Sequence, residues 1–527
     1  MLALRAPVPR VSAALADRAK AALAKALGDS RVLGDRAACE RFARDESEAI
    51  GEIPDVVVLA ANADDVATTL RIAEEIGVPV TPRAGGSGRT GGAVPVAGGI
   101  VLATDAMRAI VEIDRGDLVA VVEPGVVLAD LHAAVEAEGL FYPPDPNSSA
   151  TCCLGGNAAE NAGGPRAFKY GVTREYVLGL DATLIGGARL ACGKRTVKGV
   201  TGYDVTALFV GSEGTLGVFT SLTLRLLPKP PEVATLLGLF DGVRSAGAAV
   251  SAMIGAGVVP RCLELLDEAT LGAVRDQGVS VDARAKAMLL IEVDGDAAAC
   301  ESGMERVGNA CAEAGAIDVL VAQDASQRAR LWAARKQLSP AVRKLAKKKL
   351  SEDVVVPRSK IPALLDEVAR ITERTGVRTL TYGHAGDGNL HVNFLWNDDA
   401  DAPRVDAAIE QLMRAVVAMR GTLSGEHGIG VLKAPYLGLE QSEPLIALQE
   451  RIKATFDPKG LLNPGKIFWP RSHRACLPTL RTARRRRRSR PSSRRRASEE
   501  GPAWVAASRR PTRSERPPAA PTRSQAR

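Results

Sequence analysis

The chain has 527 residues, of which 46% are hydrophobic and 25% are charged, and its formal net charge is +8. It is long enough to bury a large core in two or three domains, which excludes a small scaffold stapled by disulfides. The charge is unevenly spread, because residues 471–527 contain 18 Arg, no Lys and three Glu and so account for +15. The first 470 residues therefore carry −7, and the basic total describes the tail rather than a body built to bind nucleic acid or a membrane.

The cysteines and the lengths of the uncharged runs indicate the cellular compartment of the protein. The eight cysteines form no CxxC pair and no iron–sulfur or zinc-ribbon spacing, so we expect reduced thiols; they are Cys39, Cys152, Cys153, Cys192, Cys262, Cys300, Cys311 and Cys476. No uncharged run is long enough to span a bilayer, and the N-terminus has no apolar core of a secretory signal, although a weak organellar presequence stays open. We predict a cytoplasmic protein, with peripheral association at the inner face of the membrane as the alternative.

Residues 1–50 are predicted to form an N-terminal helical segment, and a β-α-β unit follows. DVVVLA (55–60) is an apolar strand, and NADDVATTLRIAEEIG has apolar residues at helical spacing after Asn62, a good N-cap. Gly77 and Pro79 end this helix before a second strand that reaches Arg83. The alternation of strand, helix and strand predicts mixed α and β structure.

The next stretch, GGSGRTGG (85–92), contains glycines at GxGxxG spacing. A Rossmann fold requires a helix to begin at such a loop, but the Pro and Gly residues of GAVPVAGGIVLAT exclude one. The loop is therefore predicted to lie between strands, where its backbone N–H groups can close on a phosphate. A glycine-rich surface turn is the alternative interpretation of this stretch alone.

Two later stretches favour a binding function. Residues 142–171 (YPPDPNSSATCCLGGNAAENAGGPRAFKYG) are predicted to be a long ordered loop, too irregular for regular structure. FVGSEGTLGVFTSLTLRLLPKP (209–230) is predicted to form a strand, a turn at residues 212–214 and a second strand. Pro228, Pro230 and Pro231 then mark a domain boundary.

Three of the five histidines occur in two glycine-rich motifs. His384 and His391 in TYGHAGDGNLHVNF (381–394) are seven residues apart, so one strand would point them to opposite faces, but a turn at residues 386–388 can bring them together. SGEHGIG (424–430) adds Glu426 and His427. Two His and one carboxylate suit a divalent ion that keeps open positions. An isolated His is more often a structural residue.

These motifs in this order resemble a known family. The glycine loop, PPDP…GGNAAENAGG, GSEGTLGV, HAGDGNLH, SGEHGIG and FDPKGLLNPGKIF (456–468) resemble the vanillyl-alcohol oxidase (PCMH-type) flavoprotein superfamily. Within it, residues 50–469 look like the D-lactate dehydrogenase and glycolate oxidase FAD-subunit family, which includes D-2-hydroxyglutarate dehydrogenase. The resemblance implies an α+β fold with a two-subdomain FAD-binding domain (51–230) and an antiparallel-sheet cap (231–470) whose C-terminal segment returns to the flavin.

The resemblance also implies site residues. The pyrophosphate and flavin of FAD would be bound by Gly86, Ser87, Gly88, Gly91, Gly92, Thr151, Gly155, Gly156, Asn157, Gly163, Glu213 and Gly214. The phosphate loop has no His, so FAD is expected to be noncovalent. His384, His391 and Glu426 would bind a divalent metal, zinc first and manganese or iron as alternatives, with His427 as the general base. WAARKQLSPAVRK (332–344) is predicted to be one helix that places Arg335 and Ser339 on one face, where both would bind the substrate with Asn393.

The expected reaction is oxidation of a D-2-hydroxy acid, D-lactate or glycolate, by hydride transfer from C2 to the flavin, with metal-assisted deprotonation by His427. D-2-hydroxyglutarate is the alternative substrate, but that branch carries a further Lys where this chain has Ser351. Electrons would pass to a quinone, a cytochrome, electron-transfer flavoprotein or a separate iron–sulfur subunit, and a homodimer is one state that the sequence allows. A metal-dependent hydrolase would explain only the ligands.

The tail, residues 471–527, is predicted to be disordered, because its Arg, Ser, Pro and Ala cannot bury a core. It contains one aromatic residue, Trp504, so stacking on nucleic-acid bases is not expected. Phosphate contacts with a polyanion and an extension without function are both compatible with this composition.

Overall fold

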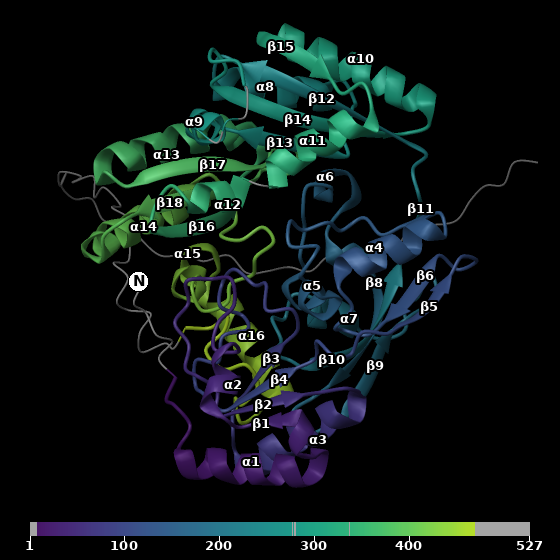
Figure 1. The fold of residues 1–527 in the computed structure, drawn as a ribbon, viewed down its shortest axis with the longest axis vertical. Coiled ribbons are helices and arrows are strands. Elements are labelled where there is room, and N and C mark those ends of the chain that lie inside the picture. Colours follow the sequence, from purple (N-terminus) through teal and green to yellow (C-terminus); the bar gives the residue numbers. More distant parts are fainter. Residues whose placement is uncertain (1–7, 277, 279–280, 337, 470–527) are drawn as a thin grey trace, which may run out of the picture. The chain divides into compact units, whose positions relative to one another are not determined.

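Three larger β-sheets, one two-stranded sheet and the helices around them make up the part of the chain that the structure describes (Figure 1). The structure is a computed structural model that describes residues 8–276, 278, 281–336 and 338–469, without the side chains of residues 333, 334, 336, 339 and 340. The tail predicted from composition therefore lies outside the described residues. Among the described residues, every helix is too short or too polar to traverse a lipid bilayer.

The first sheet has the order β1-β2-β4-β3, with β2, β4 and β3 parallel and β1 antiparallel to β2. The predicted helix joins β2 to β3, and it begins where the Asn62 side chain accepts a hydrogen bond from the Asp65 N–H at 2.9 Å. It ends at Gly77, which has a left-handed φ of +84°. The elements of this part are α1 (Ala13–Leu27), β1 (Val32–Leu33), α2 (Arg36–Glu40), β2 (Val56–Leu59), α3 (Ala63–Ile76), β3 (Val80–Arg83) and β4 (Ile100–Ala103).

The second sheet is antiparallel and has the order β5-β6-β10-β8-β9. β7 and β11 form a separate two-stranded sheet, and β11 follows β10 in the chain just before the third sheet begins. The elements of this part are β5 (Ile110–Asp114), β6 (Val119–Val122), α4 (Leu128–Ala137), β7 (Leu140–Phe141), α5 (Leu154–Glu160), α6 (Ala167–Tyr170), β8 (Val177–Thr183), β9 (Arg189–Gly193), α7 (Val205–Phe209), β10 (Val218–Arg225) and β11 (Leu227–Pro228).

Two expectations for this part were wrong. The segment 142–171 is not wholly irregular, because LGGNAAE forms α5 and AFKY forms α6. The residues before the turn at 212–214 form α7 rather than a strand, since the Asp204 side chain caps them by accepting from the Ala207 N–H at 2.9 Å. Only the second predicted strand forms, as β10.

The third sheet is a seven-stranded antiparallel sheet, β15-β12-β14-β13-β17-β18-β16. Helices α8, α10, α13 and α14 pack on one face, and α9 and α12 pack on the other. Its elements are β12 (Glu232–Phe240), α8 (Val243–Gly255), β13 (Cys262–Leu266), α9 (Glu268–Asp276), β14 (Ala287–Gly295), α10 (Ala297–Glu313), β15 (Ala316–Val321), α11 (Ala325–Lys336), α12 (Leu338–Arg343), β16 (Lys348–Val355), α13 (Ile361–Thr375), β17 (Arg378–His384), β18 (Asn389–Trp396) and α14 (Ala402–Ala418).

The helix predicted over residues 332–344 is divided into α11 and α12. Residue 337, between the two helices, lies outside the described residues. Arg335 belongs to α11 and Ser339 to α12.

The C-terminal segment returns to the first sheet. After α15 (Leu437–Glu440) and α16 (Glu443–Phe456), the N–H of Val80 donates to Leu461 O at 2.8 Å and the N–H of Asn463 donates to Val80 O at 2.7 Å. The Asn463 side chain also donates to Gly92 O and Glu213 O. Figure 1 shows α16, in yellow-green, beside β3 and β4. Residues far apart in the sequence thus close one site.

Candidate active site

The β17–β18 hairpin brings the two histidines of the glycine-rich motif together. His384 ends β17 and pairs with Asn389, while His391 pairs with Tyr382, so the turn between the strands folds the chain back as expected. Gly388 has a φ of +87°, and a Cβ there would lie 2.0 Å from Val356 O, so the tight turn requires glycine. The two imidazole centroids are 5.4 Å apart.

Glu426 completes a buried group of three possible metal ligands. Its Oε1 lies 3.5 Å from Nε2 of both His384 and His391, and ligand atoms of all three residues lie within 4.8 Å of one another. His384 Nδ1 is hydrogen-bonded to Glu264, which turns its Nε2 toward Glu426. His384 Nε2 and Glu426 Oε2 are buried and have no hydrogen-bond partner among the described residues. Two imidazole nitrogens and a carboxylate with free lone pairs fit a divalent ion such as zinc, whose binding would displace the proton that Glu264 favours on His384.

A second group, Asp353 with His391 and His427, has similar spacing but fits a metal less well. Oδ2 of Asp353 already accepts hydrogen bonds from the N–H groups of Gly425, Glu426 and His427 at 2.8, 2.9 and 3.0 Å. It also accepts from the Ser424 hydroxyl at 3.0 Å. These four donors occupy the lone pairs that a metal would need, so Asp353 anchors the SGEHG loop instead.

Glu264 joins His384 to Arg335. The Arg335 Nε donates to Glu264 Oε2 at 2.6 Å, and its guanidinium lies 5.0 Å from the centre of the Tyr382 ring. Burial acts to raise the pKa of Glu264, but the positive charges of Arg335 and His384 outweigh it and lower that pKa to about 2. Glu264 is therefore a carboxylate at neutral pH, and it fixes the orientation of both side chains.

His427 lies beside the three-residue group. Its ring stacks on that of His391, with centroids 5.3 Å apart and planes inclined by 18°. Its side chain is 19% exposed, and burial lowers the pKa of its imidazole. A neutral imidazole at the edge of a cavity is suited to accept a proton.

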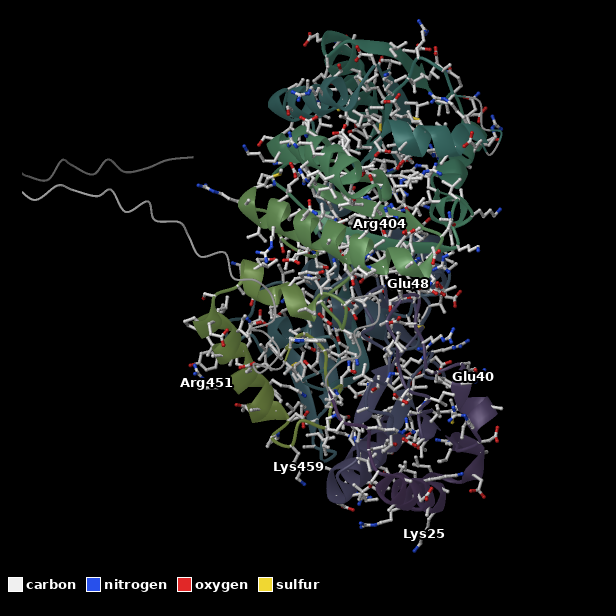
Figure 2. All side chains as sticks on the ribbon, turned by 90° about the vertical axis from the view of Figure 1, so that its left-hand side faces the viewer. Lys25, Glu40, Glu48, Arg404, Arg451 and Lys459 are labelled. Atoms are coloured by element: carbon white, nitrogen blue, oxygen red, sulfur yellow. The ribbon has the colours of Figure 1, made fainter. Side chains whose placement is uncertain are left out.

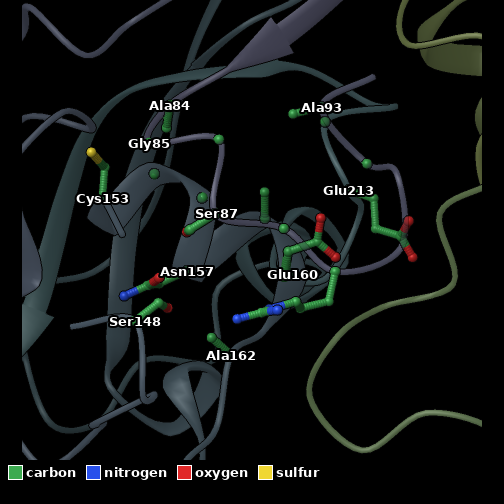
Figure 3. A pocket seen from close by; sticks show the side chains of 18 of the residues that line it. Ala84, Gly85, Ser87, Ala93, Ser148, Cys153, Asn157, Glu160, Ala162 and Glu213 are labelled. Carbon is green, nitrogen blue, oxygen red and sulfur yellow. The ribbon is translucent and has the colours of Figure 1, made fainter. Parts of the chain in front are cut away.

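These residues open onto a cavity whose other walls come from the first two sheets. Figure 3 shows Ser87, Asn157 and Ser148 on the left of this cavity and Glu160 and Glu213 on the right. Of the residues expected to bind FAD or metal, or to act as base, the lining includes Gly86, Ser87, Gly88, Gly92, Gly155, Gly156, Asn157, Glu213, Gly214, His391, Glu426 and His427. Within the described residues, the N–H groups of Gly86, Ser87 and Gly88 donate to no acceptor of the chain, so they are available to a phosphate.

Other residues expected at the site do not line this cavity. Gly91 packs against Ala49 and Val431, and the exposed Thr151 donates to Ser148 O at 3.2 Å. Gly163 lies against one of the three possible metal ligands instead, since a Cβ there would lie 3.0 Å from Glu426 Oε2. His384, Arg335 and Asn393 are buried and are not among the lining residues, although Arg335 stacks on Tyr382, which is one of them. The side chain of Ser339 is outside the described residues.

Comparison with known proteins identifies the family. The FAD binding domain model matches residues 54–193, and the model named FAD linked oxidases, C-terminal domain matches residues 229–467. The glycolate oxidase subunit GlcD of Bacillus subtilis is 40% identical over 431 residues, which are 81% of this chain and 92% of that protein. The chain belongs to the FAD-linked oxidases. The D-lactate dehydrogenase of Anaerostipes hadrus is 34% identical over 84% of this chain and 96% of that protein.

Solved structures agree with this FAD-linked oxidase fold. A p-cresol methylhydroxylase structure superposes with a TM-score of 0.73 over 87% of this chain and 98% of its own, at 17% identity. The 4-ethylphenol oxidase of Gulosibacter chungangensis also gives 0.73, over 88% and 99%, at 21% identity. The expected PCMH-type fold is therefore confirmed, and the matched FAD-binding domain supports FAD as the cofactor.

Sequence reasoning missed Asp353, Glu264 and Lys433. Asp353 and Glu264 are fully buried, and Lys433 is 2% exposed and donates to Asp353 O and Leu423 O. A signal for the two acids was present, because each is a carboxylate inside an apolar strand, in SEDVVV and CLELL. Such residues are rarely buried unless they are paired, so a partner was implied.

Proposed function

We propose that this FAD-linked oxidase oxidises a 2-hydroxy acid to the 2-oxo acid. The observation that carries the proposal is that His391, Glu426 and His427 line the same cavity as the glycine loop. A proton acceptor, a metal-ligand set and a phosphate-binding loop around one cavity are what this oxidation needs. The names of the two relatives, glycolate oxidase subunit and D-lactate dehydrogenase, support glycolate and D-lactate as the first compounds to test.

Each residue has a stated role in this proposal. His384, His391 and Glu426 hold a divalent ion, and His427 takes the proton of the substrate hydroxyl. Glu264 engages Nε and Nη2 of Arg335, which leaves Nη1 to bind the substrate carboxylate. Bound FAD supplies the acceptor for the C2 hydride, and the ion supplies positive charge that lowers the pKa of the hydroxyl.

The electrons must then leave the protein. The Bacillus subtilis relative is named as a subunit, which supports a partner protein as the acceptor. Since the eight cysteines have no iron–sulfur spacing, we propose that any cluster belongs to that partner.

The test is an anaerobic visible spectrum of the purified protein before and after addition of glycolate, D-lactate and L-lactate. We expect flavin bands that bleach with a 2-hydroxy acid, and loss of the bleaching after chelation with recovery on addition of zinc or manganese. His427→Gln should slow flavin reduction at least about 100-fold without loss of FAD. His132→Gln serves as the control, because His132 is a half-buried histidine whose Nε2 lies 3.0 Å from Pro144 O. Protein that stays colourless after reconstitution with FAD would favour a metal-dependent hydrolase.

A further inference from the structure

Glu160 is a carboxyl group of the cavity wall to which the proposed reaction gives no role. It is the last residue of α5, and Figure 3 shows its side chain on the side of the cavity where Glu213 lies. Its Oε2 is buried, and within the described residues no hydrogen bond or ion pair reaches either oxygen of this carboxyl group. Because a buried polar group without a partner is costly, we expect a bound molecule to supply the partner.

Two glycines show where the Glu160 carboxyl group lies. A Cβ at Gly92, in the glycine loop, would lie 2.6 Å from Glu160 Oε1, and a Cβ at Gly428 would lie 2.1 Å from Glu160 Oε2. Gly428 directly follows His427, the residue that takes the substrate proton in our proposal. The hydride and the proton leave adjacent atoms of a 2-hydroxy acid, so the flavin ring has to lie near His427. Glu160 is therefore placed between the phosphate-binding loop and the reacting end of the cavity.

The surroundings of Glu160 favour its protonated form. Burial raises its pKa well above the ordinary value, and the carboxyl groups of Glu213 and Asp45 raise it further, while the ammonium of Lys466 opposes them. The Glu213 carboxylate accepts two backbone N–H groups, and that of Asp45 accepts the N–H of Ser47. Glu160 accepts no hydrogen bond from the described part of the chain. It is thus the first of the three to hold a proton, and its O–H is a hydrogen-bond donor.

We propose that Glu160 donates a hydrogen bond from its carboxyl O–H to the flavin ring of bound FAD and so raises the reduction potential of the flavin. This inference rests on the proposed function for the presence of FAD and not for the identity of the substrate. A flavin ring gains negative charge when it is reduced, and a hydrogen bond to a more negative acceptor is stronger. The bond therefore stabilises reduced FAD more than oxidised FAD. An ionised Glu160 would have the opposite effect, because its negative charge would repel the reduced flavin.

The test is the midpoint potential of the bound flavin, measured by equilibration with redox dyes under a chemical reductant, so that no substrate is needed. In Glu160→Ala we expect reduced FAD to be bound at least about tenfold more weakly relative to oxidised FAD, which lowers the potential by about 30 mV for a two-electron couple. Glu160→Gln keeps a neutral donor of the same size and should change this ratio by less than about threefold. Glu40→Ala is the matched control, because the exposed Glu40, labelled in Figure 2, ends α2 as Glu160 ends α5. It should leave the potential unchanged.

A higher potential in both Glu160 variants would reveal a carboxylate and overturn the proposal, and so would wild-type potentials in both. If Glu160→Ala does not retain FAD, the infrared difference spectrum between the reduced and oxidised wild type decides. We expect the carbonyl band of a protonated carboxyl group to shift on reduction and to be absent from Glu160→Gln; a spectrum without this band refutes the donor. A flavin that the chemical reductant bleaches but no 2-hydroxy acid does would refute the proposed function separately, and the potentials would still decide the role of Glu160.

Discussion

Asp353 is the residue on which most of the local order of the site depends. One of its oxygens accepts four hydrogen bonds from residues 424–427, and the other accepts one from the Asn389 side chain. Lys433 lies 3.8 Å away and, with His427, overcomes the effect of burial and lowers the pKa of Asp353 well below its ordinary value. The residue binds no substrate in our proposal, but it sets the backbone that carries both Glu426 and His427.

We predict that Asp353→Asn lowers metal affinity by about 10–100-fold and kcat/KM by a similar factor. The reason is that an amide has one acceptor oxygen and adds donors, so it cannot hold four N–H and O–H groups or balance Lys433. Metal content after equilibrium dialysis and flavin reduction rates measure the two effects. FAD content should stay near the wild-type value, because the phosphate loop is elsewhere.

Asp399→Asn is the control, since Asp399 is exposed and pairs only with Lys348 among the contacts described for it. Wild-type metal affinity in Asp353→Asn would show that the loop is ordered by its own sequence and that Asp353 is dispensable. The role of Asp353 could not be predicted from the sequence. A sequence reveals ligand types by spacing, as for His384 and His391, but the number of donors that reach Asp353 depends on a loop 71 to 74 residues away.

At the scale of elements, the glycine-rich segment 424–432 is held from two sides. Asp353 holds its first part, while Glu213 accepts hydrogen bonds from the N–H groups of Ile429 and Gly430 at 2.7 and 2.6 Å. Thr90 adds a third attachment, since its carbonyl accepts from Val431 and Leu432. Glu213 has a φ of +53°, a conformation that only a well-anchored non-glycine residue keeps. The segment therefore ties the third sheet to the glycine loop.

We predict that Glu213→Gln raises the Kd for FAD about tenfold, which corresponds to about 1.4 kcal/mol. Gln can accept one of the two backbone hydrogen bonds but not both, so the segment against the cavity loosens. FAD titration of the apoprotein by flavin fluorescence measures the change. Glu232→Gln, at an exposed position at the start of β12, should leave the Kd unchanged. An unaltered Kd in Glu213→Gln would mean that the segment contributes nothing to FAD retention.

The elements that were predicted correctly from the sequence are those whose ends are set by neighbouring cap, glycine or proline residues. Asn62 and Gly77 delimit α3, and Pro and Gly residues keep the glycine loop free of helix. One error arose where a local cap decided, because Asp204 caps α7 where a strand was expected. Helix α5 was hidden because its two glycines, Gly155 and Gly156, disfavour helix, yet Gly155 is required where a Cβ would lie 2.6 Å from Pro124.

At the scale of the whole molecule, the chain combines a body of net charge −7 with a tail of net charge +15. Every residue that we assign to the site lies between Gly86 and His427, and the C-terminal closure includes contacts of Asn463, Lys466 and Ile467. We predict that a chain ending at residue 470 keeps its FAD and retains kcat/KM within about twofold. The full chain should bind heparin or single-stranded DNA, with affinity that falls steeply as salt rises, and the shortened chain should not. Binding that survives the truncation would place the polyanion site on the body, against its negative charge, and loss of FAD would make the tail part of the flavin site.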